Sequence, residues 1–174
     1  MKADPVLRSL EKFHGKRLLL DTNLLLRYFM GCFYRLSPEI QPHSSFNEEE
    51  FDLLAQIIGH FKKPGRVLTT PHLLTEVSNV SKKLKENRTA FLLFIRQMIP
   101  ELDERFDARR IGAARLAGQE CFLRFGLADA AIIDLSYDPV LILTNDKAMA
   151  SYLQKEKKRK NVLYFGDLKE RCLN

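Results

Sequence analysis

The stretch RLLLDTNLLLRYF, residues 17–29, carries an apolar run directly into Asp21 and resumes it after two polar residues. The run KRLLL shows no polar alternation, which is typical of a strand buried on both faces of a parallel sheet. A carboxylate at the end of such a strand lies at the edge of a core, where desolvation and nearby like charge disfavour its ionised form. Asp21 therefore needs a cation of the protein, a cation from solution, or the N-terminus of a helix that it caps.

The size and charge of the chain limit what it can be. Its 174 residues suit a single domain with a substantial core, which we assign to residues 1–174. The composition, 45% hydrophobic and 29% charged, is that of an ordinary globular protein. The net charge of +6 favours an anionic partner such as a nucleic acid, although many basic proteins bind no such partner.

The cysteines and the hydropathy pattern indicate where the protein works. Cys32, Cys121 and Cys172 are odd in number and widely spaced, and neither they nor the four histidines have zinc-site spacing. Charged residues interrupt the first sixteen positions, so they do not read as a signal peptide. No run approaches the ~18 apolar residues of a membrane span. We expect a soluble protein in a reducing cytoplasm, with no membrane partner.

Short apolar runs alternate with helical patterns along the chain. The predicted strands are 16–20, 66–70, 140–144 and 161–165, and the predicted helices are 5–13, 24–29, 47–61, 71–80, 86–99, 104–124, 127–136 and 145–160. Asn47 and Glu50 have the spacing of a capping box, and Pro71 suits the first turn of a helix. Residues 30–46 are predicted to be a long loop. Alternation of this kind predicts an α/β fold with a central parallel sheet.

Four carboxylates follow strands or lie near helix starts, and each has apolar neighbours. They are Asp21, Glu76, Asp129 and Asp146. Because ligands of parallel sheets bind outside the carboxyl ends of the strands, we expect these side chains to meet at one edge. Each could instead be a helix cap or a solvated helical acid, taken singly. Asp134 lies five positions after Asp129, which turns it to another side of the helix, so we predict a supporting role for it.

Convergence of these acids requires a counter-charge. Two carboxylates about 5 Å apart repel by roughly 3 kcal/mol at an effective dielectric constant of 20. A divalent cation removes this repulsion, and oxygen-only ligands favour Mg²⁺ or Mn²⁺ over zinc. The sequence therefore predicts a Mg²⁺ or Mn²⁺ site made by the four acids.

The segments LLLDTNLLL, TEVSN, LADAAII and LTND occur in this order over most of residues 16–165, and together they resemble the signature of the PIN-domain ribonucleases. The resemblance implies a three-layer α/β/α sandwich, a Mg²⁺ or Mn²⁺ ion in an acidic pocket, and cleavage of RNA. It assigns catalysis and metal binding to Asp21, Glu76, Asp129 and Asp146. It gives polar supporting roles to Asn23, Thr144 and Asn145.

Two functions follow from this resemblance. The first is a metal-dependent endoribonuclease, possibly the toxin of a toxin–antitoxin pair, whose partners are RNA and an antitoxin protein or a second copy. The alternative is a PIN-like module that binds RNA or assembles without catalysis. Arg27, Arg115 and Arg124 are the candidate substrate-binding cations. Other catalytic folds find no support, since the chain lacks DxD after its first strand, GxGxxG, GxxxxGK and G-x-S-x-G.

The length of residues 30–50 is unusual for this family. Asp21 and Glu76 are 55 positions apart (76 − 21), and the surplus reads as an insertion at about 30–50. Apolar residues occur throughout it, among them Phe33 and Tyr34. We predict that residues 30–46 pack against another chain, either a second copy or an inhibitor, because an exposed apolar patch of this kind usually marks an interface. A substrate lid is the alternative.

Overall fold

A computed structural model describes residues 10–61, 66–108 and 112–172, without the side chains of residues 99–108. Its centre is a five-stranded sheet of order β3-β2-β1-β4-β5 in which every neighbouring pair is parallel. The strands are β1 (Arg17–Leu20), β2 (Val67–Thr69), β3 (Phe106–Ala108), β4 (Val140–Thr144) and β5 (Val162–Tyr164). The predicted α/β class with a parallel central sheet is confirmed.

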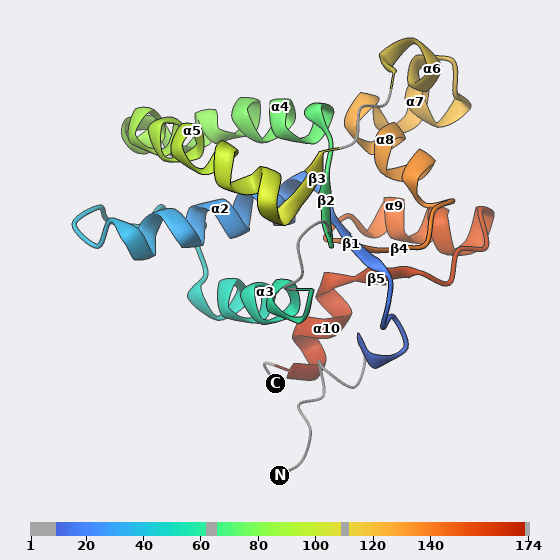
Figure 1. Cartoon of the computed structure of the whole chain (residues 1–174), viewed down its shortest axis with the longest axis horizontal. Coiled ribbons are helices and arrows are strands. Elements are labelled where there is room, and N and C mark those ends of the chain that lie inside the picture. The colour runs from blue at the N-terminus through green and yellow to red at the C-terminus, as the bar shows by residue number, and fades with distance from the viewer. Residues whose placement is uncertain (1–9, 62–65, 109–111, 173–174) are drawn as a thin grey trace.

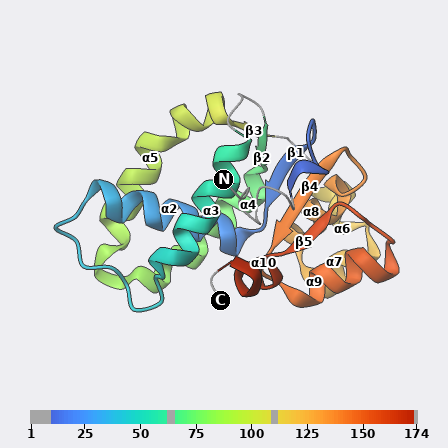
Figure 2. The ribbon, with the colours of Figure 1, turned by 90° about the horizontal axis from the view of Figure 1, so that it is seen from below.

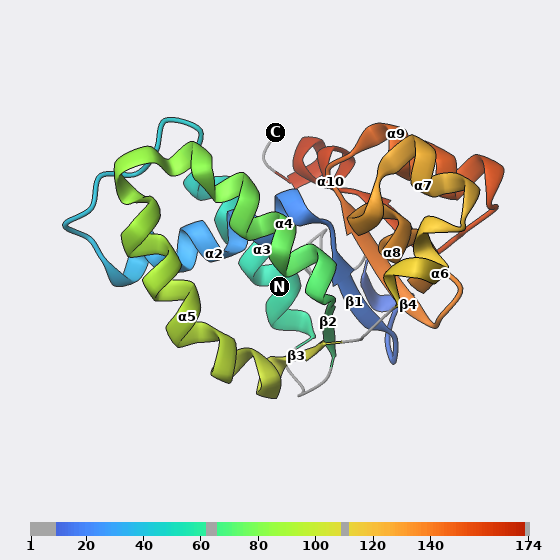
Figure 3. The same cartoon turned by 90° about the horizontal axis from the view of Figure 1, so that it is seen from above.

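The helices cover both faces of this sheet and extend to one side of it. They are α2 (Thr22–Leu36), α3 (Glu48–His60), α4 (Pro71–Val80), η1 (Ser81–Asn87), α5 (Arg88–Arg105), α6 (Ala113–Ala117), α7 (Glu120–Phe125), α8 (Leu127–Leu135), α9 (Lys147–Ser151), η2 (Tyr152–Glu156) and α10 (Phe165–Cys172). Figure 1 shows α4 and α8 above the sheet and α3 and α10 below it, which gives the three-layer sandwich. Figures 2 and 3 show α2, α3 and α5 forming a helical lobe beside the strands.

The core follows from the apolar strands. Leu18, Leu19 and Leu20 are buried, and every residue of β4 is buried as well. In the register of the sheet, Leu20 of β1 lies beside Leu143 of β4. Asp21, which directly follows β1, therefore lies level with Thr144, the last residue of β4. This alignment places the residues that follow the two strands next to each other.

The structure corrects several predicted elements. The predicted helix 104–124 is wrong, because this region holds the end of α5, strand β3 and the short helices α6 and α7. The terminal helix α10 was not predicted. The predicted helix 145–160 ends at Glu156, and its last turn is a π-helix. The predicted helix 5–13 lies largely outside the described residues.

The predicted loop 30–46 is wrong for residues 30–36. Helix α2 continues to Leu36, so the loop begins at Ser37. Phe33 and Tyr34 belong to this helix and are buried in the protein itself. The Phe33 ring meets the Phe91 ring of α5 edge-on, with the ring centroids 5.6 Å apart. These two aromatic residues are therefore core residues of the helical lobe, and the predicted interface with another chain is not available to them.

Candidate functional site

Asp21 caps the helix that follows the first strand. Its Oδ1 accepts a hydrogen bond of 2.8 Å from the Leu24 backbone N–H. Its Oδ2 accepts bonds of 2.6 Å from the Thr144 hydroxyl and from the Asn145 backbone N–H. The helix-cap alternative for this residue is thus what the structure shows, and the carboxylate also ties β1 to the end of β4.

Burial dominates the electrostatics of Asp21. The residue is only 3% exposed, and this desolvation raises its pKa above the ordinary aspartate value. The hydrogen bonds from Thr144, Leu24 and Asn145 oppose that rise, because they stabilise the ionised form. The carboxylate is therefore held in place by donors that do not fully replace its lost hydration.

Thr144 connects Asp21 with Asp146. The Thr144 hydroxyl donates to Asp21 and accepts a bond of 2.9 Å from the Asp146 backbone N–H. Asp146 caps α9, where its Oδ1 accepts a bond of 2.9 Å from the Met149 N–H. A fully buried hydroxyl thus fixes the relative positions of two acids that are 125 residues apart (146 − 21).

Glu76 and Asp129 complete the group from two other helices. Glu76 on α4 accepts a bond of 2.6 Å from the Thr22 hydroxyl, next to Asp21. Asp129 lies in the first turn of α8, and its pKa is raised to about 7. The causes are burial first, and then the charges of Glu76, Asp146 and Asp21. The structure therefore brings all four predicted acids together, and we call Asp21, Glu76, Asp129 and Asp146 the acid cluster.

Other predicted residues lie outside the acid cluster. Asp134 accepts bonds from Arg115, at 2.7 Å, and from Gln119, at 2.9 Å. It joins α8 to the α6–α7 segment, in agreement with the supporting role predicted for it. Arg124 pairs with Glu156 at 3.1 Å. Arg115 and Arg124 are thus both engaged in ion pairs within the protein.

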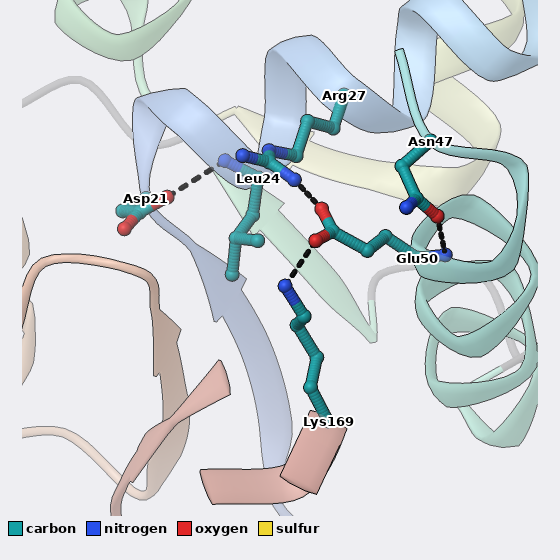
Figure 4. Close-up of polar contacts among 6 residues, drawn as sticks. All are labelled: Asp21, Leu24, Arg27, Asn47, Glu50 and Lys169. Atoms are coloured by element: carbon teal, nitrogen blue, oxygen red, sulfur yellow. Dashed lines mark hydrogen bonds and ion pairs between the residues drawn. The ribbon is translucent and has the colours of Figure 1, made fainter. Parts of the chain in front are cut away.

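Arg27 is a predicted cation on which an acid of the cluster, Asp21, acts. The charge of Asp21 raises the pKa of its guanidinium, although burial has the larger and opposite effect. Figure 4 shows the guanidinium of Arg27 directed at Glu50 of α3, whose carboxylate also pairs with Lys169 of α10. Asn23, one turn before Arg27, is exposed.

The role of Glu50 was missed by sequence reasoning. Its N–H donates a bond of 2.9 Å to the Asn47 side chain, as the capping box predicts. Its own carboxylate does not complete the box, because it is buried between Arg27 and Lys169. Glu50 ends the acidic run EEE, which is typical of a solvated helix start, so no local pattern distinguishes it from its two neighbours.

The chemistry of the acid cluster suits a hard divalent cation. All of its donors are carboxylate oxygens, and their mutual repulsion contributes to the raised pKa of Asp129. The side chains do not form a closed set of ligands, however. Across residues 10–61, 66–108 and 112–172, no group of three or more His, Cys, Asp or Glu side chains is placed so that it could hold a metal ion. Binding of an ion would require carboxylates of the cluster to turn toward it.

Comparisons of this chain with protein-family models, with curated proteins and with solved structures found no match. Within the described residues, no helix has both the length and the apolar character needed to cross a membrane.

Proposed function

We propose that this protein is a Mg²⁺- or Mn²⁺-dependent endoribonuclease. The observation that carries the proposal is the acid cluster, in which the charges of Glu76, Asp146 and Asp21 act on Asp129 at the carboxyl end of a parallel sheet. Such a concentration of half-buried carboxylates destabilises the fold unless a cation is bound. A site with such unfavourable repulsion among its carboxylates is best explained by a cation that these carboxylates bind.

The acids would divide the work according to their environments. Asp21 is held rigidly by three hydrogen bonds, and it fixes the position of one ligand oxygen. Asp129 and Asp146 are half-buried and can complete the ligand set. Glu76 is oriented by Thr22 and can bind the ion or orient the attacking water. A bound divalent cation would lower the pKa of a coordinated water and offset charge on the phosphate.

RNA is the substrate that the whole chain favours. The net charge of +6 attracts a polyanion even though the acid cluster repels it. The order of the four acidic segments, which resembles that of the PIN-domain ribonucleases, supports the same substrate. A role as the toxin of a toxin–antitoxin pair, inhibited by a protein partner in the cytoplasm, belongs to this proposal. The odd number and wide spacing of the cysteines agree with a reducing compartment.

A non-catalytic RNA-binding module is the second candidate. It is favoured by one observation, namely that the described acid side chains do not surround a metal position. In that case Asp21 and Asp146 would serve as helix caps, and RNA would bind to basic residues outside the acid cluster.

The two candidates differ in an RNA cleavage assay with Mn²⁺ or Mg²⁺. The wild type should cleave single-stranded RNA, EDTA should stop the reaction, and Asp129→Asn should lower the rate by at least about 100-fold, comparable to losses at other catalytic groups. Asp134→Asn is the matched control, because it changes the same chemical group on the same helix outside the acid cluster. Equal rates for wild type and Asp129→Asn, or no cleavage with either metal, would refute the nuclease proposal.

A further inference from the structure

A cleft of about 260 Å³ lies beside the acid cluster on the helical lobe. Its walls come from α2, from the loop before α3, and from the α4–η1 junction. Its lining includes Asn23, Arg27, Met30, Phe46, Val80 and Lys83. The roles proposed above for the acid cluster do not involve the cleft.

Two helices lead from the acid cluster to the cleft. On α2, Asp21 is the cap, and Asn23 and Arg27 follow on one side of the helix because they are four positions apart. On α4, Glu76 and Val80 are related in the same way. The bond from Thr22 to Glu76 joins the first residue of α2 to the second half of α4. The cleft therefore begins about one helical turn from the acid cluster on both helices.

The loop wall of the cleft is fixed by contacts within the chain. The Tyr34 hydroxyl accepts a bond of 3.1 Å from the His43 backbone N–H, and its ring meets the Phe46 ring at 5.1 Å between centroids. The Asn87 side chain donates a bond of 3.3 Å to the Gln41 carbonyl. These contacts join the loop to α2 and to η1, so the loop builds a wall of the cleft from its own chain.

The cleft combines an apolar interior with cations. Met30, Phe46 and Val80 supply apolar and aromatic surface, while Arg27 and Lys83 supply positive charge. Glu50 pairs with both Arg27 and Lys169, so this group of three charges keeps a net positive charge. Lys83 is exposed, and it reaches the cleft from η1. An aromatic and aliphatic wall suits a base, and adjacent cations suit its phosphate.

We propose that this cleft binds one nucleotide of single-stranded RNA next to the phosphate that the acid cluster cleaves. The base lies against Phe46 and Val80, and the phosphate lies between Arg27 and Lys83. This inference rests on the proposed function for the identity of the polymer. The volume of the cleft is just below the range of roughly 300–1,000 Å³ for small-molecule pockets, so it suits a single nucleotide rather than a longer segment.

The first test compares two neighbouring lysines. Lys82 and Lys83 are both exposed on η1, but only Lys83 lines the cleft. Binding of a fluorescent single-stranded oligoribonucleotide is measured in EDTA, so that cleavage does not enter the result. Lys83→Ala should weaken binding by about 5- to 10-fold and reduce the salt dependence by about one phosphate contact. Lys82→Ala should change the affinity by less than about twofold. Equal effects of the two variants would overturn the proposal.

A second measurement locates the RNA. Protein labelled with ¹³C at the methionine methyl groups is titrated with the same oligoribonucleotide in EDTA, and Met30 is assigned with Met30→Leu. Met30 lines the cleft, whereas the Met149 N–H contacts Asp146 of the acid cluster. A shift at Met30 supports the proposal even if no cleavage is ever seen. A shift at Met149 alone overturns it, and leaves the nuclease proposal standing if cleavage is observed.

Discussion

The carboxylate of Asp129 has a pKa of about 7 because it is half-buried and because three other carboxylates act on it. Asp21 is more deeply buried, yet it receives three hydrogen bonds that favour its ionised form. Among the described residues, no hydrogen-bond donor offsets the effects of burial and like charge on Asp129. The repulsion among the acids therefore has a strong effect on the pKa of Asp129.

This raised pKa predicts the pH dependence of stability. The pKa of Asp129 is about 7 in the folded protein and 3.8 in the unfolded chain, so the folded state binds more protons between these values. Stability falls as the pH rises through this window. Without metal, Asp129→Asn should raise the free energy of unfolding by about 1–2 kcal/mol at pH 8, after allowance for solvent screening. The gain should vanish near pH 4.

Urea unfolding of wild type and Asp129→Asn at pH 4, 6 and 8 would measure this effect. Asp134→Asn is again the control, since Asp134 bonds to Arg115 and should lose stability at pH 8. A gain for Asp129→Asn that is the same at every pH would show that ionisation of this residue is not its cause.

At the same scale, the sequence predicted which acids gather but not how they are held. Apolar neighbours and positions after strands set the four acids apart from solvated ones. The family resemblance named Thr144 and Asn145 as polar companions of the acids, but Thr22 was not predicted, because its bond to Glu76 depends on the packing of α2 against α4. The role of Glu50 could not be predicted for the same reason, since its buried ion pairs join three helices that are distant in sequence.

At the scale of elements, the buried strands were the most predictable part of the chain. Strand β4 was predicted at its observed bounds because VLILT is uniformly apolar. Strand β3 was missed because its sequence FDA contains an acid and lies among charged residues. It is an edge strand with one neighbour, β2, so its sequence is under weaker constraint. Helix α10 was missed because its short sequence, FGDLKERC, is mostly polar.

The end of α2 was misplaced for a different reason. Two prolines and a Ser pair favoured a loop over the whole of residues 30–46, but the helix continues through Gly31 to Leu36 because Phe33 and Tyr34 pack inside the helical lobe. Tertiary packing thus outweighs the low helix propensity of glycine. The loop that remains, from Ser37 to Asn47, contains the residues that form one wall of the cleft.

Glu50 offers a test of how α2, α3 and α10 are joined. Its carboxylate is buried and pairs with Arg27 and Lys169, so Glu50→Gln leaves two cations close together without their shared anion. We expect the free energy of unfolding to fall by about 1–3 kcal/mol. Asp52→Asn on the same helix is the control, because its ion pair with Arg35 is exposed and should contribute less than about 0.5 kcal/mol.

Denaturant unfolding at neutral pH would compare the two variants. A loss for Glu50→Gln no larger than that for Asp52→Asn would show that the three-helix contact contributes little to stability. A larger loss that disappears at high salt would assign it to screened surface charge instead.

At the scale of the whole molecule, the strand order explains why the acids meet where they do. From β1 the chain proceeds to β2 and β3 on one side, and then crosses to β4 and β5 on the other. The direction of winding therefore reverses between β1 and β4, and in open parallel sheets ligands bind outside the carboxyl ends of the strands at such a point. Asp21 and Asp146 follow these two strands. The alternation of strands and helices predicted a parallel sheet, but several strand orders would have satisfied it.

The same arrangement gives a prediction for metal binding to the intact protein. A cation that binds the folded acid cluster and not the unfolded chain stabilises the fold by about 1.4 kcal/mol at ten times its dissociation constant. For a chain of this size, that corresponds to a rise of roughly 3–6 °C in melting temperature. Mn²⁺ should produce this rise in the wild type and much less of it in Asp146→Asn, which loses one anionic ligand. Glu156→Gln should respond like the wild type, because Glu156 pairs with Arg124 away from the cluster. Equal shifts in all three proteins would place the bound Mn²⁺ elsewhere. No shift in the wild type would favour the non-catalytic module, in which Asp21 and Asp146 serve only as helix caps.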